Sequence, residues 1–141
     1  MSEDIRKMID KVKNFKQFVN EDINNVKEIS LQEAIKLSQK RDVIDVGEWL
    51  HKPIDEIKFY YKEEPITLFS DTIHEMESTY DEFVKDRKRT EYIVDLLDDG
   101  NKPMAIFVEL NDKDKFIMEG RHRIVAFSWF GMNTVPVIYV V

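Results

Sequence analysis

The closing stretch of the chain, Lys115–Val141, reads KFIMEGRHRIVAFSWFGMNTVPVIYVV. Its pattern predicts a strand that ends at Glu119, a turn at Gly120 and a short apolar helix that stops at Gly131. A second apolar strand then ends the stretch. Two strands joined through a helix are typical of a mixed α/β domain, and the rest of the chain is interpreted around this unit.

Three basic side chains stand where the predicted helix begins, namely Arg121, His122 and Arg123. A helix start presents unpaired backbone N–H groups and the positive end of the peptide dipoles, so it favours an anion, most often phosphate. Gly120 would let the backbone approach that phosphate closely. We expect Arg123 to face solvent and contact the phosphate at two points, and His122 to donate to an oxygen or carry a proton. Glu119 could hold magnesium, act as a base, or simply pair with an arginine. This interpretation requires the three basic side chains to lie together beside a cavity.

Composition limits the class of protein. The chain has 141 residues, 43% of them hydrophobic, which suffices for one domain with a core. The net charge of -7 argues against a whole-surface attraction to DNA or to an anionic membrane. The absence of cysteine excludes disulfides and thiolate nucleophiles, and the histidines have no metal-ligand spacing, so no metal site made by the protein is expected. Without a signal peptide or a long apolar run, we expect a cytoplasmic protein with no membrane partner.

Residues 1–40 are predicted to form an N-terminal helical extension, and residues 41–141 the main domain. Apolar residues recur at three- and four-residue spacing from Met1 to about Asn20, which predicts an amphipathic helix. This helix could pack on the domain, or it could be an arm that forms a homodimer or binds a partner protein. Ser30 and Glu33 match a capping box, which predicts a short helix over Ser30–Lys40.

Strands and helices are expected to alternate through the middle of the chain. Aromatic and β-branched residues bounded by prolines predict strands and turns over Arg41–Phe69, and Ile66–Phe69 is interpreted as a buried strand. Thr72 and Glu75 match a second capping box, which predicts a helix over Asp71–Lys85. A dense basic run follows, namely Lys85, Arg87, Lys88 and Arg89. It could be a solvated connection, or it could make a second contact to phosphate.

A further helix and a β-hairpin lead to the closing stretch. The inward face of this helix is predicted to carry Tyr92, Ile93, Leu96 and Leu97. Gly100 suits a left-handed stop at its end. Pro103 opens a strand, Met104–Leu110, whose near-continuous apolar content predicts burial on both faces. A polar turn at residues 111–114 should fold this strand against Lys115–Glu119.

The order of these features resembles the ParB/sulfiredoxin superfamily over Thr90–Val141. The matching residues are, in order, Leu96 and Leu97, Gly100 and Pro103, the box Gly120-Arg121-His122-Arg123, then Ala126, Gly131 and Val135-Pro136-Val137. In that superfamily the box binds the phosphates of a nucleotide. ParB partition proteins carry Gly-Glu-Arg-Arg and use CTP, sulfiredoxins carry Gly-Cys-His-Arg and use ATP, and ADP-dependent free serine kinases carry a His-Arg pair.

The resemblance implies a nucleotide-binding set that consists of Gly120, Arg121, His122, Arg123, Lys102 and Pro103. Arg121 stands where sulfiredoxins have their nucleophilic cysteine, so a sulfiredoxin reaction is excluded. Arg121 also replaces the ParB glutamate, so ParB-style magnesium handling and use of CTP are not expected. A ParB partition protein has a helix-turn-helix domain after this one, and the sequence stops at Val141, so we do not expect a complete partition protein.

The sequence therefore predicts an α+β, ParB/sulfiredoxin-like domain that binds ATP, ADP or another nucleoside phosphate with Mg²⁺. It would transfer or hydrolyse a phosphate, with Glu119 and His122 as the candidate catalytic residues. One alternative is a ParB-like nuclease or DNA-modification component that grips the nucleic-acid backbone. Another is a non-catalytic nucleotide sensor or interaction module.

Overall fold

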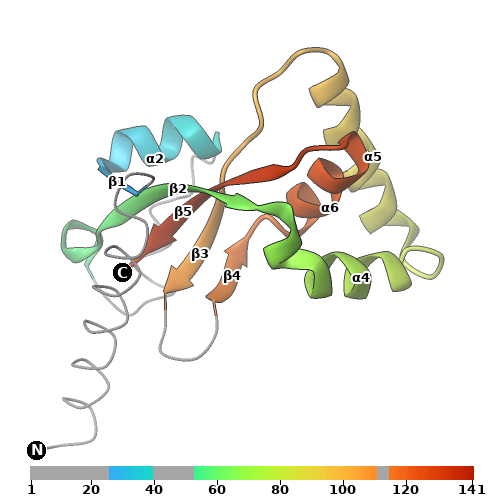
Figure 1. The fold of residues 1–141 in the computed structure, drawn as a ribbon, viewed down its shortest axis with the longest axis horizontal. Coiled ribbons are helices and arrows are strands. Elements are labelled where there is room, and N and C mark those ends of the chain that lie inside the picture. Colours follow the sequence, from blue (N-terminus) through green and yellow to red (C-terminus); the bar gives the residue numbers. More distant parts are fainter. Residues whose placement is uncertain (1–25, 40–52, 111–114) are drawn as a thin grey trace, which may run out of the picture.

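A computed structural model describes residues 26–39, 53–110 and 115–141 (Figure 1). Its strands are β1 (Lys27–Ile29), β2 (Phe59–Pro65), β3 (Ile106–Leu110), β4 (Lys115–Glu119) and β5 (Thr134–Val140). Its helices are α2 (Leu31–Ser38), α4 (Ser70–Ser78), α5 (Val84–Asp98) and α6 (Arg121–Phe130), with the 3-10 turns η2 (Ile54–Glu56) and η3 (Ile66–Phe69). This part of the chain has the predicted α+β class, and the helix predicted from Met1 to Asn20 lies outside the described residues.

The described strands form one mixed sheet in the order β1-β2-β5-β3-β4. The central strand β5 is antiparallel to β2 and parallel to β3. It has strands on both edges and helices over both faces, which is why Val135–Val140 is buried throughout. β3 and β4 pair antiparallel, so the predicted hairpin is confirmed, although its turn at residues 111–114 lies outside the described residues. β1, from the predicted N-terminal extension, pairs with β2 and extends the sheet.

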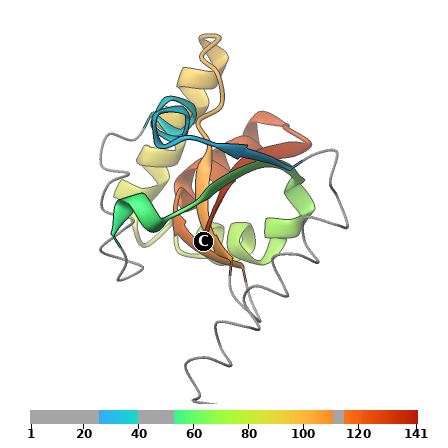
Figure 2. The same ribbon diagram turned by 90° about the vertical axis from the view of Figure 1, so that its left-hand side faces the viewer.

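Helices cover both faces of the sheet (Figure 2). α4, α5 and α6 lie on one face, where α5 and α6 form a core cluster with Ile106 and Val108 of β3. α2 lies on the other face, where Ala34 packs in a second cluster with Phe59 and Phe107. Alternate residues of β3 therefore enter different clusters, as expected for a strand that is buried on both faces.

The prediction of a strand over Ile66–Phe69 is wrong, because this segment is the 3-10 turn η3. β2 ends one residue earlier, and the Ile66 N–H donates to the Asn133 carbonyl beyond the last pair of the ladder. Phe69 enters the core, whereas Leu68 is 46% exposed. A short apolar run suits either a strand or a tight helical turn, and its periodicity does not separate the two.

The single helix predicted over Asp71–Lys85 is also wrong, because the chain forms α4, a turn and then α5. α4 begins at Ser70 without a side-chain cap, so the capping box at Thr72 is not formed. It ends where the Ser78 and Thr79 hydroxyls donate to the carbonyls of residues 75 and 76, which satisfies groups that a helix end leaves free. The basic run therefore lies in the first turns of α5 and not in a connection.

α5 turns only part of its predicted face inward. Ile93 and Leu97 are buried, but Tyr92 is 63% exposed, so its predicted position is wrong. Consecutive side chains of a helix point about 100° apart, so Tyr92 and Ile93 do not face the core together, and Ile93 is the one that is buried. Gly100 ends the helix as predicted, with φ +88° and its N–H donating to the Leu97 carbonyl at 3.0 Å. No helix in the described part of the chain is both long and apolar enough to cross a membrane.

Candidate anion site at the starts of α5 and α6

Gly120 begins α6 in a conformation that favours glycine. Its φ of +114° is in the left-handed range. A Cβ atom at this position would lie 2.5 Å from Cγ2 of Ile106, at the start of β3. The close approach at this glycine is therefore an approach of α6 to the protein's own strand, which explains the glycine without a phosphate.

Arg123 points into the protein, so the expectation that it faces solvent is wrong. Its Nη1 atom donates to the Ser38 carbonyl at 2.9 Å and to the Ala105 carbonyl at 2.8 Å. Burial lowers the pKa of Arg123, and the charge of Glu119 opposes this effect. The end of a helix leaves carbonyls without partners and favours a cation, so Arg123 stabilises the end of α2 and ties it to β3.

Gly120 and Arg123 together dock α6 onto the start of β3. Residues three apart share a face of a helix. Gly120 lies against Ile106, and Arg123 donates to the carbonyl of the preceding residue, Ala105. Between them, Arg121 is exposed and His122 is half-buried. The three basic side chains of the box therefore do not lie together as the sequence interpretation required, because Arg123 turns inward.

His122 connects α6 to α5. Its Nε2 atom lies 3.1 Å from Oδ1 of Asp86, and both side chains are partly exposed. Asp86 belongs to the first turn of α5, and His122 belongs to the first turn of α6. Two helix N-termini therefore meet here, and each carries the positive end of a helix dipole, equivalent to about +0.5 of a charge. The sequence interpretation missed Asp86, although an acid inside a basic run is a signal that could have found it.

The contact between His122 and Asp86 brings together two basic stretches that lie far apart in the sequence. The exposed cations on the two helix starts are Lys85, Lys88, Arg89 and Arg121. Arg87 is half-buried, and its Nε atom lies 3.7 Å from Oε1 of Glu91, which is a loose pair along the helix. The starts of α5 and α6 thus carry these four exposed cations together with the Asp86 carboxylate.

Glu119 lies at the end of β4 and is half-buried. Its charge raises the pKa of Arg123, which favours the alternative in which this carboxylate accompanies an arginine. A catalytic role for Glu119 stays a prediction. Within the described residues, no three His, Asp or Glu side chains come together as a group that could hold a metal ion.

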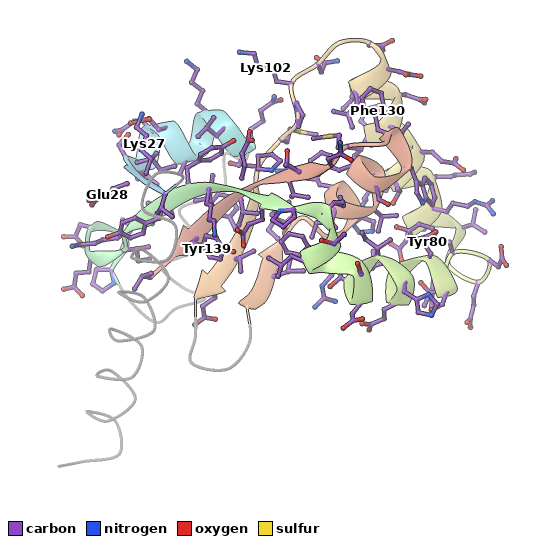
Figure 3. The ribbon with its side chains drawn as sticks, viewed as in Figure 1. Lys27, Glu28, Tyr80, Lys102, Phe130 and Tyr139 are labelled. Atoms are coloured by element: carbon purple, nitrogen blue, oxygen red, sulfur yellow. The ribbon has the colours of Figure 1, made fainter. Side chains whose placement is uncertain are left out.

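Lys102 and Pro103, the other members of the predicted set, line a cavity of about 280 Å³. Figure 3 shows Lys102 on the loop between α5 and β3, where its side chain extends toward α2. No box residue lines this cavity, whose other walls come from α2, β2 and the segment around the start of β5. The structure therefore gives Lys102 and Pro103 a cavity that the box does not share.

Comparison of the chain with protein-family models, with curated proteins and with solved structures finds no match. The resemblance to the ParB/sulfiredoxin superfamily rests on the sequence motifs. The elements that carry those motifs follow one another as α5, β3, β4, α6 and β5.

Proposed function

We propose that this chain binds a nucleoside di- or triphosphate where α5 and α6 begin. The observation that supports the proposal is the contact of 3.1 Å between His122 and Asp86, which places two helix N-termini side by side. This α5/α6 surface is defined by Lys85, Asp86, Lys88, Arg89, Arg121 and His122.

Phosphate suits this surface because both helices contribute. An anion near one helix N-terminus gains about 0.3–1 kcal/mol, and Arg121 adds a guanidinium that can grip two phosphate oxygens. Asp86 already lies between the helix starts, so a bare phosphate would compete with it for His122. Mg²⁺ is commonly held by one or two carboxylates together with substrate phosphates. Asp86 would be such a carboxylate, which makes a phosphate that carries Mg²⁺ a better ligand than a bare one.

The reaction we propose is transfer or hydrolysis of a phosphate. Phosphoryl transfer depends mainly on positioning and on neutralising charge, which cations and helix starts supply. His122 could donate to a phosphate oxygen or carry a proton, and Glu119 is the second candidate for acid–base work. Arg123 is a positioning residue in this proposal, because its Nη1 atom contacts backbone carbonyls.

We also infer that the fold is of the ParB/sulfiredoxin type. The support is the order of motifs along the chain, from the helix with Leu97 through Pro103 and the hairpin to the box and the final strand. β3 and β5 run parallel, with the hairpin and α6 between them in the chain.

A thermal-shift scan tests nucleotide binding. The unfolding midpoint is measured with ATP, ADP, CTP and GTP, each with and without Mg²⁺. We expect a Mg²⁺-dependent rise with at least one of them, since a ligand at a hundred times its Kd stabilises the native state by about 2.7 kcal/mol. Arg121→Ala should reduce this rise, and Asp86→Asn should remove its dependence on Mg²⁺. Lys27→Ala, at an exposed lysine of β1, is the control that should change neither. If no nucleotide moves the midpoint, nucleotide binding is excluded.

The exposed face of α5 favours nucleic acid as a second candidate ligand. Lys85, Lys88, Arg89 and Tyr92 recur at three- and four-residue spacing, and all four are exposed. Such a row could follow a phosphate backbone while the tyrosine ring stacks on a base, as a ParB-like nuclease or DNA-modification component would require. Affinity for a labelled oligonucleotide that falls steeply with salt and is reduced in Lys88→Ala would favour this candidate. Nucleotide binding without turnover would instead indicate a non-catalytic sensor.

A further inference from the structure

We propose that this chain has a second binding site, independent of the α5/α6 surface, for a small organic acid with an apolar body. The site is the cavity of about 280 Å³ that Lys102 and Pro103 line, named here the α2–β5 cavity. Its walls come from the end of α2, the loop between α5 and β3, the middle of β2 and the start of β5.

The α2–β5 cavity exists because α2 is too short to cover its whole face of the sheet. α2 has eight residues, which is about 12 Å of helix, and its core cluster includes Ile138 and Val140 near the end of β5. The β2–β5 ladder extends farther, to the pair of Glu63 with Pro136 and then to Thr134. These three residues line the cavity, so the part of the sheet beyond α2 forms one of its walls.

Three hydrogen bonds fix the position of the end of α2 against β3. The Ala105 N–H donates to the Leu37 carbonyl at 2.9 Å. Nη1 of Arg123 donates to the Ser38 carbonyl at 2.9 Å and to the Ala105 carbonyl at 2.8 Å. Two of the cavity walls are thereby held together without a ligand. A site that is formed in advance loses less conformational entropy when a ligand enters.

Two lysines from different walls place positive charge at the α2–β5 cavity. Lys36 lies in the last turn of α2, and Lys102 extends toward α2 from the facing loop (Figure 3). Within the described part of the chain, neither ammonium group has a hydrogen-bond or ion-pair partner. From β2, the Tyr61 hydroxyl donates to the Glu63 carboxylate at 3.3 Å. An acid group would therefore bind at the lysines, and a ligand hydroxyl or amine could donate to Glu63.

Apolar residues and a small volume define the rest of the ligand. The apolar lining consists of Leu37, Pro103, Met132 and Pro136. A dry cavity of about 150 Å³ accepts benzene, so by the same ratio the α2–β5 cavity accepts roughly 11 non-hydrogen atoms. This is enough for one ring or a short chain with an acid group, and too little for a nucleotide. The ligand class is therefore a small aromatic or aliphatic acid.

Titration of the ¹⁵N-labelled full chain tests the proposal by NMR with benzoate, phenyl phosphate and the neutral benzyl alcohol. We expect benzoate or phenyl phosphate to shift the amide signals of Leu37, Lys102 and Thr134 with a Kd in the millimolar range. The better of the two acids should bind about tenfold tighter than benzyl alcohol, because two exposed ion pairs contribute only modestly. Tighter binding of benzoate assigns carboxylates as the head group, and tighter binding of phenyl phosphate assigns phosphate monoesters.

Variants separate the charge from the cavity. The double variant Lys36→Gln with Lys102→Gln should weaken binding of the acid about tenfold and leave benzyl alcohol unchanged. The matched control, Lys27→Gln with Lys58→Gln, alters two exposed lysines that line neither the cavity nor the α5/α6 surface and should change neither. Equal affinity for benzoate, phenyl phosphate and benzyl alcohol would overturn the proposal, as would the absence of saturable shifts. Shifts confined to the first turns of α5 and α6 would also overturn it while supporting the α5/α6 surface.

Discussion

Replacing Arg123 with alanine should lower the free energy of unfolding by about 3 kcal/mol. Its Nη1 atom makes two hydrogen bonds, of 2.9 and 2.8 Å, to carbonyls of α2 and of the segment before β3. A hydrogen bond that involves a charged group contributes about 1.5–3 kcal/mol. The side chain is only half-buried, so water can reach the two carbonyls that lose their donor. We therefore take the lower value of about 1.5 kcal/mol for each bond, which gives about 3 kcal/mol for the two bonds together. At roughly 3 °C per kcal/mol, the midpoint should fall by roughly 10 °C.

Urea unfolding followed by circular dichroism measures this change, with the slope m as the check on two-state behaviour. Arg121→Ala is the matched control, because the neighbouring arginine at the same helix start is exposed, and its loss should stay below about 0.5 kcal/mol. Arg123→Lys should fall between the two, since lysine keeps the charge but lacks the planar fork. If Arg123→Ala changes the free energy no more than Arg121→Ala does, the two hydrogen bonds contribute nothing net and the anchoring of α2 is refuted.

Three further predictions concern stability. Gly120→Ala should lower the free energy of unfolding by about 3 kcal/mol, and Gly100→Ala by only about 1 kcal/mol. Both glycines have positive φ, but only at Gly120 would a Cβ atom clash with β3. Equal losses in urea unfolding would show that β3 moves to accommodate the Cβ atom. Burial is the largest of the effects that raise the pKa of Tyr139, and the hydrogen bond of 2.6 Å to Glu64 is the next largest. As pH rises, the phenol of the unfolded chain therefore loses its proton before that of the folded protein does. Stability should therefore fall as pH rises above about 10, and Tyr139→Phe should flatten that part of the profile of unfolding free energy against pH; an unchanged slope would contradict the assignment. Ser30→Ala should lower stability by about 1 kcal/mol, because its Oγ atom accepts an N–H of the first turn of α2 at 3.2 Å; unchanged hydrogen exchange in that turn would argue against the cap.

The features that could be predicted from the sequence are those that neighbouring residues decide. The closing stretch folds as predicted because Gly120 and Gly131 adopt positive φ at the two ends of α6, and apolar residues on either side suit buried strands. The Ser30 cap depends on a residue three positions away. The sequence does not predict the turn between α4 and α5, because a hydroxyl that donates to a carbonyl of the preceding turn can stand inside a helix as well as at its end, as Thr90 does in α5.

The arrangement of the candidate site could not be predicted, because it depends on contacts between distant residues. The partners of Arg123 lie 85 and 18 positions away in the chain, and the partner of His122 lies 36 positions away. Nothing in the local sequence distinguishes an arginine that binds phosphate from one that binds backbone carbonyls, since both use the same donors. The cavity at Lys102 likewise depends on where α2 stops above the sheet.

The arrangement of the box changes how its resemblance to nucleotide-binding boxes should be weighed. Gly120 is required by its approach to Ile106, and Arg123 is occupied by the carbonyls of Ser38 and Ala105. A glycine and an arginine at this spacing are therefore explained by the docking of α6 on β3, whether or not a phosphate binds. The information about a ligand lies in the two residues between them, which the docking leaves partly exposed. These residues start a helix beside a second helix start, and substitutions there, not at the anchoring pair, will separate a loss of binding from a loss of folding.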